Sequence, residues 1–272
     1  MPRSSSLSPR ALLRLATEQR KLEAEEERPL VLSGARRLVA KLARELTPGA
    51  SPGSLSEGED FEHAEAVVYL LHGEPKSEDR RRLRAAGLAH VPIVCVRIGE
   101  GSAPLPEVLA TDIARVPSAE QLPVEEIGRL LARRLEGRAA GLAVRVPVLR
   151  PWICREMIQQ SARRAAALGA AVFVPAPDLP PLFFEQARLI LRLGYAHGRR
   201  LEPLRAAELV AVLAAGLGFR RIARRVRGET FFPVWALQGS IAYAGTRALG
   251  EAALLYFSGD GHELGPPGPD RV

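Results

Sequence analysis

Two hydrophobic patterns divide the chain near residue 146. Before this point, continuous apolar runs alternate with charged helical segments. The runs are AEAVVYLL (64–71), VPIVCVRIG (91–99) and the weaker PEVLATDIARV (106–116). Strands that are apolar on both faces and separated by helices are typical of a parallel sheet covered on both sides. We therefore predict an α/β domain with a small parallel sheet over residues 29–145.

Three helices accompany these runs, two of them amphipathic and the middle one charged. They are expected over residues 35–46, 77–87 and 123–137, and in the last one Pro123 fits the first helical turn. The stretch TPGASPGSLSEGED (47–60) is rich in Pro, Gly and Ser, and it predicts a flexible loop.

From Val146 onward only helical patterns occur. Segments 149–170, 181–196, 203–226 and 233–257 are separated by stretches rich in Pro, Gly or charge. We predict an all-α bundle domain over residues 146–258, followed by a polar, disordered tail over residues 259–272.

The N-terminal 28 residues predict a helical arm. Ser8 followed by Pro9 is a helix start, and Leu15 and Leu22 recur at helical spacing before the charged run EAEEER. The weak apolar face indicates a solvated arm over residues 1–28 rather than part of a core. Nothing in this segment has the uninterrupted apolar core of a signal peptide.

Small residues recur every four positions in the helical half. The series are Ala162, Ala166 and Ala170; Ala207, Ala211 and Ala215; and Ala236, Ser240, Ala244, Ala248 and Ala252. Such stripes let neighbouring backbones approach closely, in membranes and in tight soluble bundles. They predict which helix faces touch.

The most apolar long segment, residues 231–257, raises the question of a membrane span. A span needs about 20 mostly apolar residues, and Arg247 and Glu251 interrupt this one. A hairpin of the last two helices would place the basic run at 220–227 in a cytoplasmic loop and require export of the α/β domain. We favour a soluble or peripherally attached bundle, with an integral membrane protein as the alternative.

Charge and cysteine content give little further information about the function. The net charge of +7 comes mainly from arginine, and an arginine-rich composition explains it as readily as an anionic partner does. Cys95 and Cys154 are far apart and suggest neither a zinc site nor a disulfide. A cytoplasmic location follows from these observations.

Residues 64–135 resemble the second half of an Era-like or Ras-like GTPase domain. Val91-Pro92 opens a strand, and Ser118-Ala119 stands before the helix that matches the last helix of that family. Where the guanine-reading Asn-Lys-x-Asp should follow, the sequence has Arg97-Ile98-Gly99-Glu100. No Gly-x4-Gly-Lys-Ser/Thr motif occurs, so nothing would cradle phosphates or hold Mg²⁺. The resemblance implies a degenerate, Rossmann- or GTPase-like scaffold that needs no nucleotide cofactor.

The helical half, residues 146–257, resembles the bacterial domain-of-unknown-function family 697. The resemblance rests on VPVLRPWICREMIQQSARRAAALGAAVFVPAPDLPP, LRAAELVAVLAAGLGFRRIARRV and IAYAGTRALGEAALLYF. It implies a GTPase-associated, sometimes membrane-associated helical module without catalytic residues to carry over.

Other catalytic or metal-binding patterns are weak. The histidines at positions 63, 72, 90, 197 and 262 have no metal-ligand spacing, and Ser240 stands inside a predicted helix rather than in a nucleophile elbow. Asp178 fits a helix cap, and Arg247 with Glu251 fits a structural ion pair. We predict no catalytic, cofactor-binding or metal-binding residue.

One cluster retains functional interest. Basic residues follow an apolar segment at Arg220, Arg221, Arg224, Arg225 and Arg227. They form either a solvated face or a contact with anionic lipid headgroups or a partner, and the scarcity of neighbouring aromatic residues argues against nucleic acid. The leading hypothesis is a non-catalytic interaction or regulatory protein whose helical module contacts a protein partner, for which a GTPase is one candidate, or the inner membrane surface. An atypical GTP-binding protein is a further alternative.

Overall fold

The computed structural model describes residues 9–24, 28–171, 180–199 and 234–259, with the short stretches 201–203, 205–206 and 208–210. The chain divides into two compact units. Residues 24–157 form the α/β unit, and residues 1–23 with 158–272 form the helical unit. The division lies inside the helix α6 (Arg150–Ala171). The predicted fold class, an α/β domain followed by a helical region, is confirmed.

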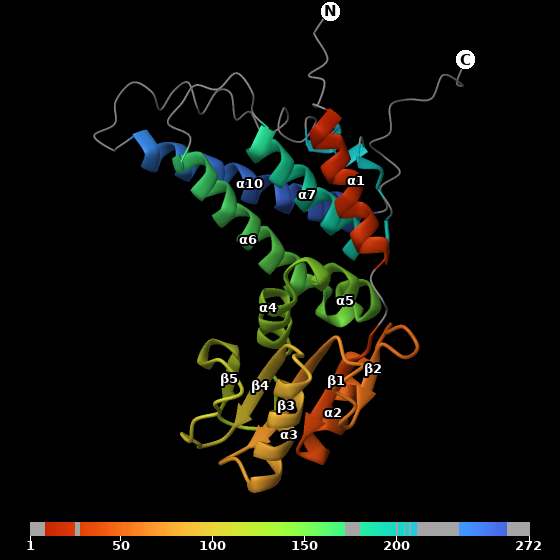
Figure 1. The fold of residues 1–272 in the computed structure, drawn as a ribbon, viewed down its shortest axis with the longest axis vertical. Coiled ribbons are helices and arrows are strands. Elements are labelled where there is room, and N and C mark those ends of the chain that lie inside the picture. Colours follow the sequence, from red (N-terminus) through yellow and green to blue (C-terminus); the bar gives the residue numbers. More distant parts are fainter. Residues whose placement is uncertain are drawn as a thin grey trace, which may run out of the picture. The chain divides into compact units, whose positions relative to one another are not determined.

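The α/β unit is built on a five-stranded parallel sheet in the order β2-β1-β3-β4-β5 (Figure 1). Its strands are β1 (Leu30–Gly34), β2 (Leu55–Glu57), β3 (Ala66–His72), β4 (Ile93–Ile98) and β5 (Ile113–Val116). Leu30 lies opposite Ala66, and Val67 lies opposite Ile93. Every residue of β4 and all but the last of β3 are buried, as expected for central strands covered on both faces.

Helices cover both faces of this sheet. They are α2 (Arg36–Leu46) after β1, α3 (Ser77–Leu88) after β3 and α4 (Val124–Leu135) after β5. Because β2 and β4 lie on opposite sides of the β1–β3 pair, right-handed crossovers place α2 and α3 on opposite faces. The core beside α3 agrees with this, since it combines Leu83 and Ala86 with alternate residues of β3 and includes none from α2 or α4.

Short elements complete the α/β unit. They are η1 (Ala110–Asp112), η2 (Glu136–Arg138), α5 (Ala139–Arg145) and η3 (Pro147–Leu149). A buried ion pair joins Arg145 of α5 to Glu65, just before β3, and Arg145 also donates to the carbonyl of Arg28. The prediction of a flexible loop over residues 47–60 is wrong in part, because that stretch contains β2, which pairs with β1.

The helical unit contains α1 (Pro9–Ala24), α7 (Pro180–Ala196), α10 (Val234–Ser258) and the C-terminal part of α6 (Figure 1). The predicted N-terminal helix is present, but the expectation that it is solvated is wrong. Leu15 is fully buried and Leu22 is 4% exposed. Leu15 and Leu22 lie about two turns apart on the same face of α1, so this face of the helix is buried.

Helices α6 and α10 approach closely through glycines. A Cβ on Gly239 would lie 3.1 Å from the carbonyl oxygen of Ala166, and one on Gly250 would lie 2.7 Å from Cγ1 of Ile158. The stripe predicted on α6 therefore does contact α10. The stripe predicted on α10 does not form the contact face, because Ser240 and Ala244 are exposed. A spacing of four drifts about 40° per step around a helix of 3.6 residues per turn, so a long stripe leaves the interface.

Among the described helices, none combines the length and the apolar character that a bilayer crossing requires. Thus the integral-membrane alternative has no support from these helices. Most of the predicted helix over residues 203–226, and the predicted tail from residue 260 onward, lie outside the described residues.

Candidate functional site

The carboxyl edge of the sheet is where a ligand site is expected in this fold. In doubly wound folds with this strand order, ligands bind outside the carboxyl ends of the strands, at the switch point between β1 and β3. The segments that follow β1, β3, β4 and β5 therefore decide what this edge can hold.

The connection from β1 to α2 is too short to cradle a phosphate. The strand ends at Gly34, and the helix begins at Arg36. The amide of the single residue between them, Ala35, donates to the carbonyl oxygen of Leu70 in β3 at 2.9 Å. A phosphate-binding loop presents several unpaired amides to the ligand. Here the one connecting amide is bonded to the neighbouring strand.

The loops after β3 and β4 are bonded to each other. The carboxylate of Glu74 accepts hydrogen bonds from the amides of Ser102 at 2.8 Å and Ala103 at 3.1 Å. The bond from Ser102 is the main reason why the pKa of Glu74 lies below its usual value. A Cβ on Gly101 would lie 2.7 Å from the carbonyl oxygen of Gly73, so the two loops are in close backbone contact.

Arg97 also holds the loop after β4. Its side chain, in β4, is 1% exposed. It donates to the carbonyl oxygens of Gly101 at 2.9 Å and Ala103 at 2.7 Å. Arg97 thus holds in place the loop that follows its own strand.

The loop after β5 is also held by the protein itself. Nζ of Lys41, in α2, donates to the carbonyl oxygens of Ala119 at 2.6 Å and of Glu120. The hydroxyl of Ser118 accepts from the amide of Glu120 at 3.4 Å. The Ser118-Ala119 dipeptide follows β5 at the carboxyl edge, and its polar groups take part in the turn before α4.

Nucleophile and metal chemistry find little support in the described part of the chain. Cys95 and Cys154 are buried, and burial raises the pKa of each thiol to about 12. Both thiols are therefore protonated and unreactive at neutral pH. No group of three His, Cys, Asp or Glu residues among the described ones could hold a metal ion. Asp178 and His262 lie outside these residues.

A shallow hollow of about 450 Å³ lies beside α4. Its charged lining residues are Glu125, Glu126, Arg129 and Arg133. Arg129 already pairs with Glu125, and Arg133 donates to Glu156 at 3.1 Å. Both arginines are therefore already paired with carboxylates, so they offer no strong attraction for an anionic ligand.

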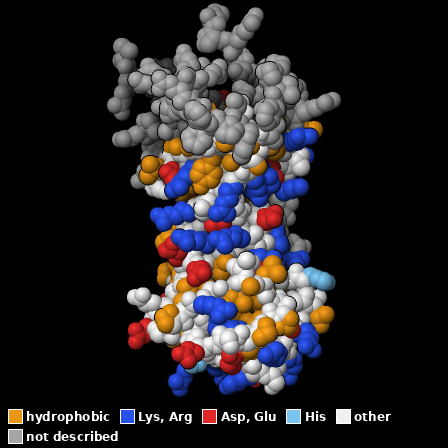
Figure 2. Space-filling model, turned by 90° about the vertical axis from the view of Figure 1, so that its left-hand side faces the viewer, with side chains coloured by type: hydrophobic (Ala, Val, Ile, Leu, Met, Phe, Trp, Pro, Cys, Tyr) orange, Lys and Arg blue, Asp and Glu red, His pale blue; other side chains and the backbone are white. Residues whose placement is uncertain are grey.

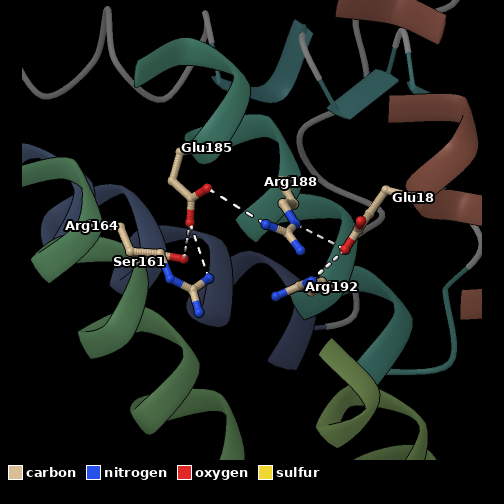
Figure 3. Close-up of polar contacts among 6 residues, drawn as sticks. All are labelled: Glu18, Ser161, Arg164, Glu185, Arg188 and Arg192. Atoms are coloured by element: carbon tan, nitrogen blue, oxygen red, sulfur yellow. Dashed lines mark hydrogen bonds and ion pairs between the residues drawn. The ribbon is translucent and has the colours of Figure 1, made fainter. Parts of the chain in front are cut away.

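The helical unit contains a cluster of charged side chains that we call the arginine cluster. Figure 3 shows its members converging from α1, α6 and α7: Glu18, Ser161, Arg164, Glu185, Arg188 and Arg192. One oxygen of Glu18 accepts from Nε of Arg188 at 2.9 Å and from Nε of Arg192 at 2.8 Å. Arg192 also donates to it through Nη2.

Glu185 holds the other side of the cluster. Its carboxylate accepts from the hydroxyl of Ser161 at 3.3 Å and lies 3.6 Å from Nη1 of Arg164 and 3.9 Å from Nη1 of Arg188. Arg188 therefore lies between the two carboxylates. Arg192 is the more buried arginine, with 8% of its side chain exposed, and it pairs with Glu18.

The electrostatics of Glu18 reflect this arrangement. Burial alone would raise the pKa of the carboxyl group, but attraction and hydrogen bonds from Arg192 and Arg188 together outweigh it and hold the pKa below its usual value. The pKa of Arg192 is lowered, first by burial and then by repulsion from Arg188. The carboxylate of Glu18 therefore offsets the repulsion between the guanidinium groups of Arg188 and Arg192.

Acid is expected to release α1 from α7. A carboxyl group whose pKa is lowered by folding stabilises the folded form above its unfolded pKa, about 4.3, and loses this contribution as the pH falls through the folded pKa. A solvent-sensitive fluorophore on Leu13→Cys, at a residue that is 71% exposed, reports the release. The native cysteines are buried and escape labelling.

The Glu18→Gln variant is the matched control for this titration. Glu185 also faces arginines of the cluster, Arg164 and Arg188, and the control separates its effect from that of Glu18. The expected transition, below the unfolded pKa of about 4.3, is present in the parent and absent in the control. An identical transition in both would show that Glu18 does not govern the docking of α1.

Several predicted residues can now be placed. Arg247 and Glu251 do form an ion pair, with Nε 2.9 Å from Oε1, but 58% of each side chain is exposed, so the pair is a surface feature. The basic residues Arg220, Arg221, Arg224, Arg225 and Arg227 lie outside the described residues. The arginine cluster was not predicted. Its signal was present, since Glu185, Arg188 and Arg192 stand at helical spacing inside the mostly apolar helix α7, and Glu18 stands between two leucines.

No protein-family model matches this chain, and no curated protein matches it. The fold defines the class of protein, a doubly wound α/β unit joined to a helical unit. The resemblances to the Era-like GTPases and to domain-of-unknown-function family 697 stay predictions.

Proposed function

We propose that this protein is a non-catalytic interaction or regulatory protein. In this proposal the α/β unit is a scaffold that needs no nucleotide, and the helical unit contacts a protein partner or the inner face of a membrane. The observation that carries it is the carboxyl edge of the sheet, whose loops are bonded by Glu74, Arg97 and Lys41 of the chain itself.

A nucleotide at this edge would have to displace those bonds. Each protein hydrogen bond contributes about 1 kcal/mol net, and bonds to charged groups contribute about 1.5–3 kcal/mol. Displacing Arg97 is especially unfavourable, because its side chain is buried and its charge would lose two carbonyl partners. A ligand would gain no phosphate loop in return.

The choice of partner rests on charge and on the resemblance of the helical half. Family 697 modules accompany GTPases, so a GTPase is the partner class that the resemblance suggests. The basic run at residues 220–227 fits anionic lipid headgroups as a second partner class. Figure 2 shows basic side chains interspersed with acidic ones over the face it presents, rather than one continuous patch of single sign. We place the protein in the cytoplasm in this proposal.

Binding of a fluorescent GTP analogue to the full chain tests the scaffold role. We expect no binding in the submicromolar range with or without Mg²⁺. An Arg97→Ala variant that remains folded serves as a comparison, since it opens the loop without supplying a phosphate loop and should bind no better. Submicromolar affinity of the parent chain would contradict the proposal in favour of an atypical GTP-binding protein.

Flotation with vesicles tests the membrane contact. Each basic residue near an anionic surface contributes about 1 kcal/mol, so changing Arg220, Arg221, Arg224, Arg225 and Arg227 to Gln should abolish binding to phosphatidylserine vesicles. Equal recovery of parent and variant with these vesicles would exclude this contact. Binding of neither, together with capture of a GTPase by the parent, would favour the protein partner.

A further inference from the structure

Helix α1 occupies a binding surface of the helical unit. Leu15, Glu18 and Leu22 lie on one face of α1, at helical spacing, and all three are largely buried. Glu18 sits between the two leucines and meets Arg188 and Arg192 of α7 (Figure 3). The face that α1 buries in the helical unit thus carries an apolar residue, a carboxylate and a second apolar residue in succession.

The positive charge of the arginine cluster requires a carboxylate such as that of Glu18 on the helix that covers it. With Glu18 present, three arginines share two carboxylates. Without it, Arg164, Arg188 and Arg192 share Glu185 alone, and no direct contact joins Glu185 to Arg192 within hydrogen-bond distance. An arginine with 8% of its side chain exposed is costly to leave without a carboxylate. The surface therefore favours occupation by an acidic helix over exposure to water.

The place of α1 in the chain permits exchange. The helix belongs to the helical unit, whereas the next element, β1, belongs to the α/β unit. No strand or helix of the helical unit directly precedes or follows α1 within the described sequence. It can consequently leave its surface without breaking the hydrogen-bond ladder of either unit.

We propose that the α7 surface around Arg188 and Arg192 is a docking site for an amphipathic helix of a protein partner, and that α1 occupies it in cis until such a helix displaces it. The partner helix carries a carboxylate with an apolar residue about one turn away on each side. This inference rests on the proposed interaction role and names the surface that performs it. α1 then serves as a built-in competitor that sets the affinity for the partner.

The test uses the full chain and a fluorescent peptide of residues 9–24. The Glu18→Lys chain, whose own α1 is repelled by the arginines, should bind the peptide at least tenfold more tightly than the parent chain, where α1 competes. A peptide with Lys at the position of Glu18 should bind neither chain. The matched control is the Glu251→Lys chain, which reverses an exposed charge of the same unit and should behave as the parent does.

If circular dichroism shows that the Glu18→Lys chain is poorly folded, the milder variant Glu18→Gln takes its place. The Glu18→Gln chain should also bind the peptide more tightly than the parent chain does. Equal affinity of the parent and both Glu18 variants, or binding by none of them, would overturn the docking site. Dimerisation of the parent that Glu18→Lys abolishes would assign the surface to a second copy of the chain and overturn the choice of partner. These outcomes are independent of nucleotide binding at the sheet edge, so this inference and the scaffold role can fail separately.

Discussion

Replacing Gly34 by Ala is expected to unfold the α/β unit or to reduce its free energy of unfolding by more than about 4 kcal/mol. The backbone of Gly34 has a φ of +111°, and a Cβ there would lie 2.2 Å from the carbonyl oxygen of Leu70. That oxygen belongs to the neighbouring strand and also accepts the amide of Ala35. Neither strand can move away without breaking the β1–β3 ladder, so the clash has no inexpensive relief.

The effect can be separated from the conformational preference of glycine. Gly53 also has a positive φ, +75°, but a Cβ there would meet no atom within 4 Å. Gly53→Ala should therefore cost only about 1–2 kcal/mol, the cost of a left-handed backbone for a residue with a Cβ. Urea denaturation in a Trp235→Phe background leaves Trp152 as the tryptophan that reports on unfolding. Equal destabilisation by the two substitutions would contradict the close approach at β1 and β3.

Much of the α/β architecture could be predicted because its central strands are buried on both faces. Continuous apolar runs identify β3 and β4, the charged segment between them identifies α3, and the amphipathic segment after β5 identifies α4. β1 and β2 were not predicted as strands. β1 has five residues, and β2 has only three at the edge of the sheet, none of them fully buried, inside a Pro- and Gly-rich stretch. The division of the chain inside α6 leaves no mark in composition, because one continuous helix serves both units.

The site was harder to predict, because its determinants are contacts between distant residues. The absence of a phosphate loop can be read from motifs, but the closure of the edge by Glu74 and Arg97 depends on loop geometry. Spacing indicated a pair between Arg247 and Glu251, and it forms on the surface. The more buried pair of Glu18 with Arg192 joins residues far apart in the sequence. No local period reveals such a pair.

Glu65→Ala is expected to lower the free energy of unfolding of the α/β unit by about 3–5 kcal/mol, the typical effect of removing one partner of a buried ion pair. Only 6% of the Glu65 side chain and 10% of the Arg145 side chain are exposed. Arg145 also donates to the carbonyl of Arg28 before β1, and its own carbonyl accepts the amide of Ser51 at 2.8 Å. Loss of the carboxylate removes a buried negative charge that faces the guanidinium of Arg145, and it loosens these attachments of α5.

The double variant Glu65→Leu with Arg145→Met tests whether charge burial is the cause. It removes both charges while keeping apolar volume, and such replacements are often neutral or stabilising. The double variant should recover most of the stability that Glu65→Ala loses, as measured by the urea midpoint of Trp152 fluorescence in the Trp235→Phe background. Equal stability of parent and Glu65→Ala would show that solvent screens the pair. A double variant less stable than Glu65→Ala would instead show that the bonds of Arg145 to the backbone hold α5 on the sheet, because they contribute more than the pairing of charges does.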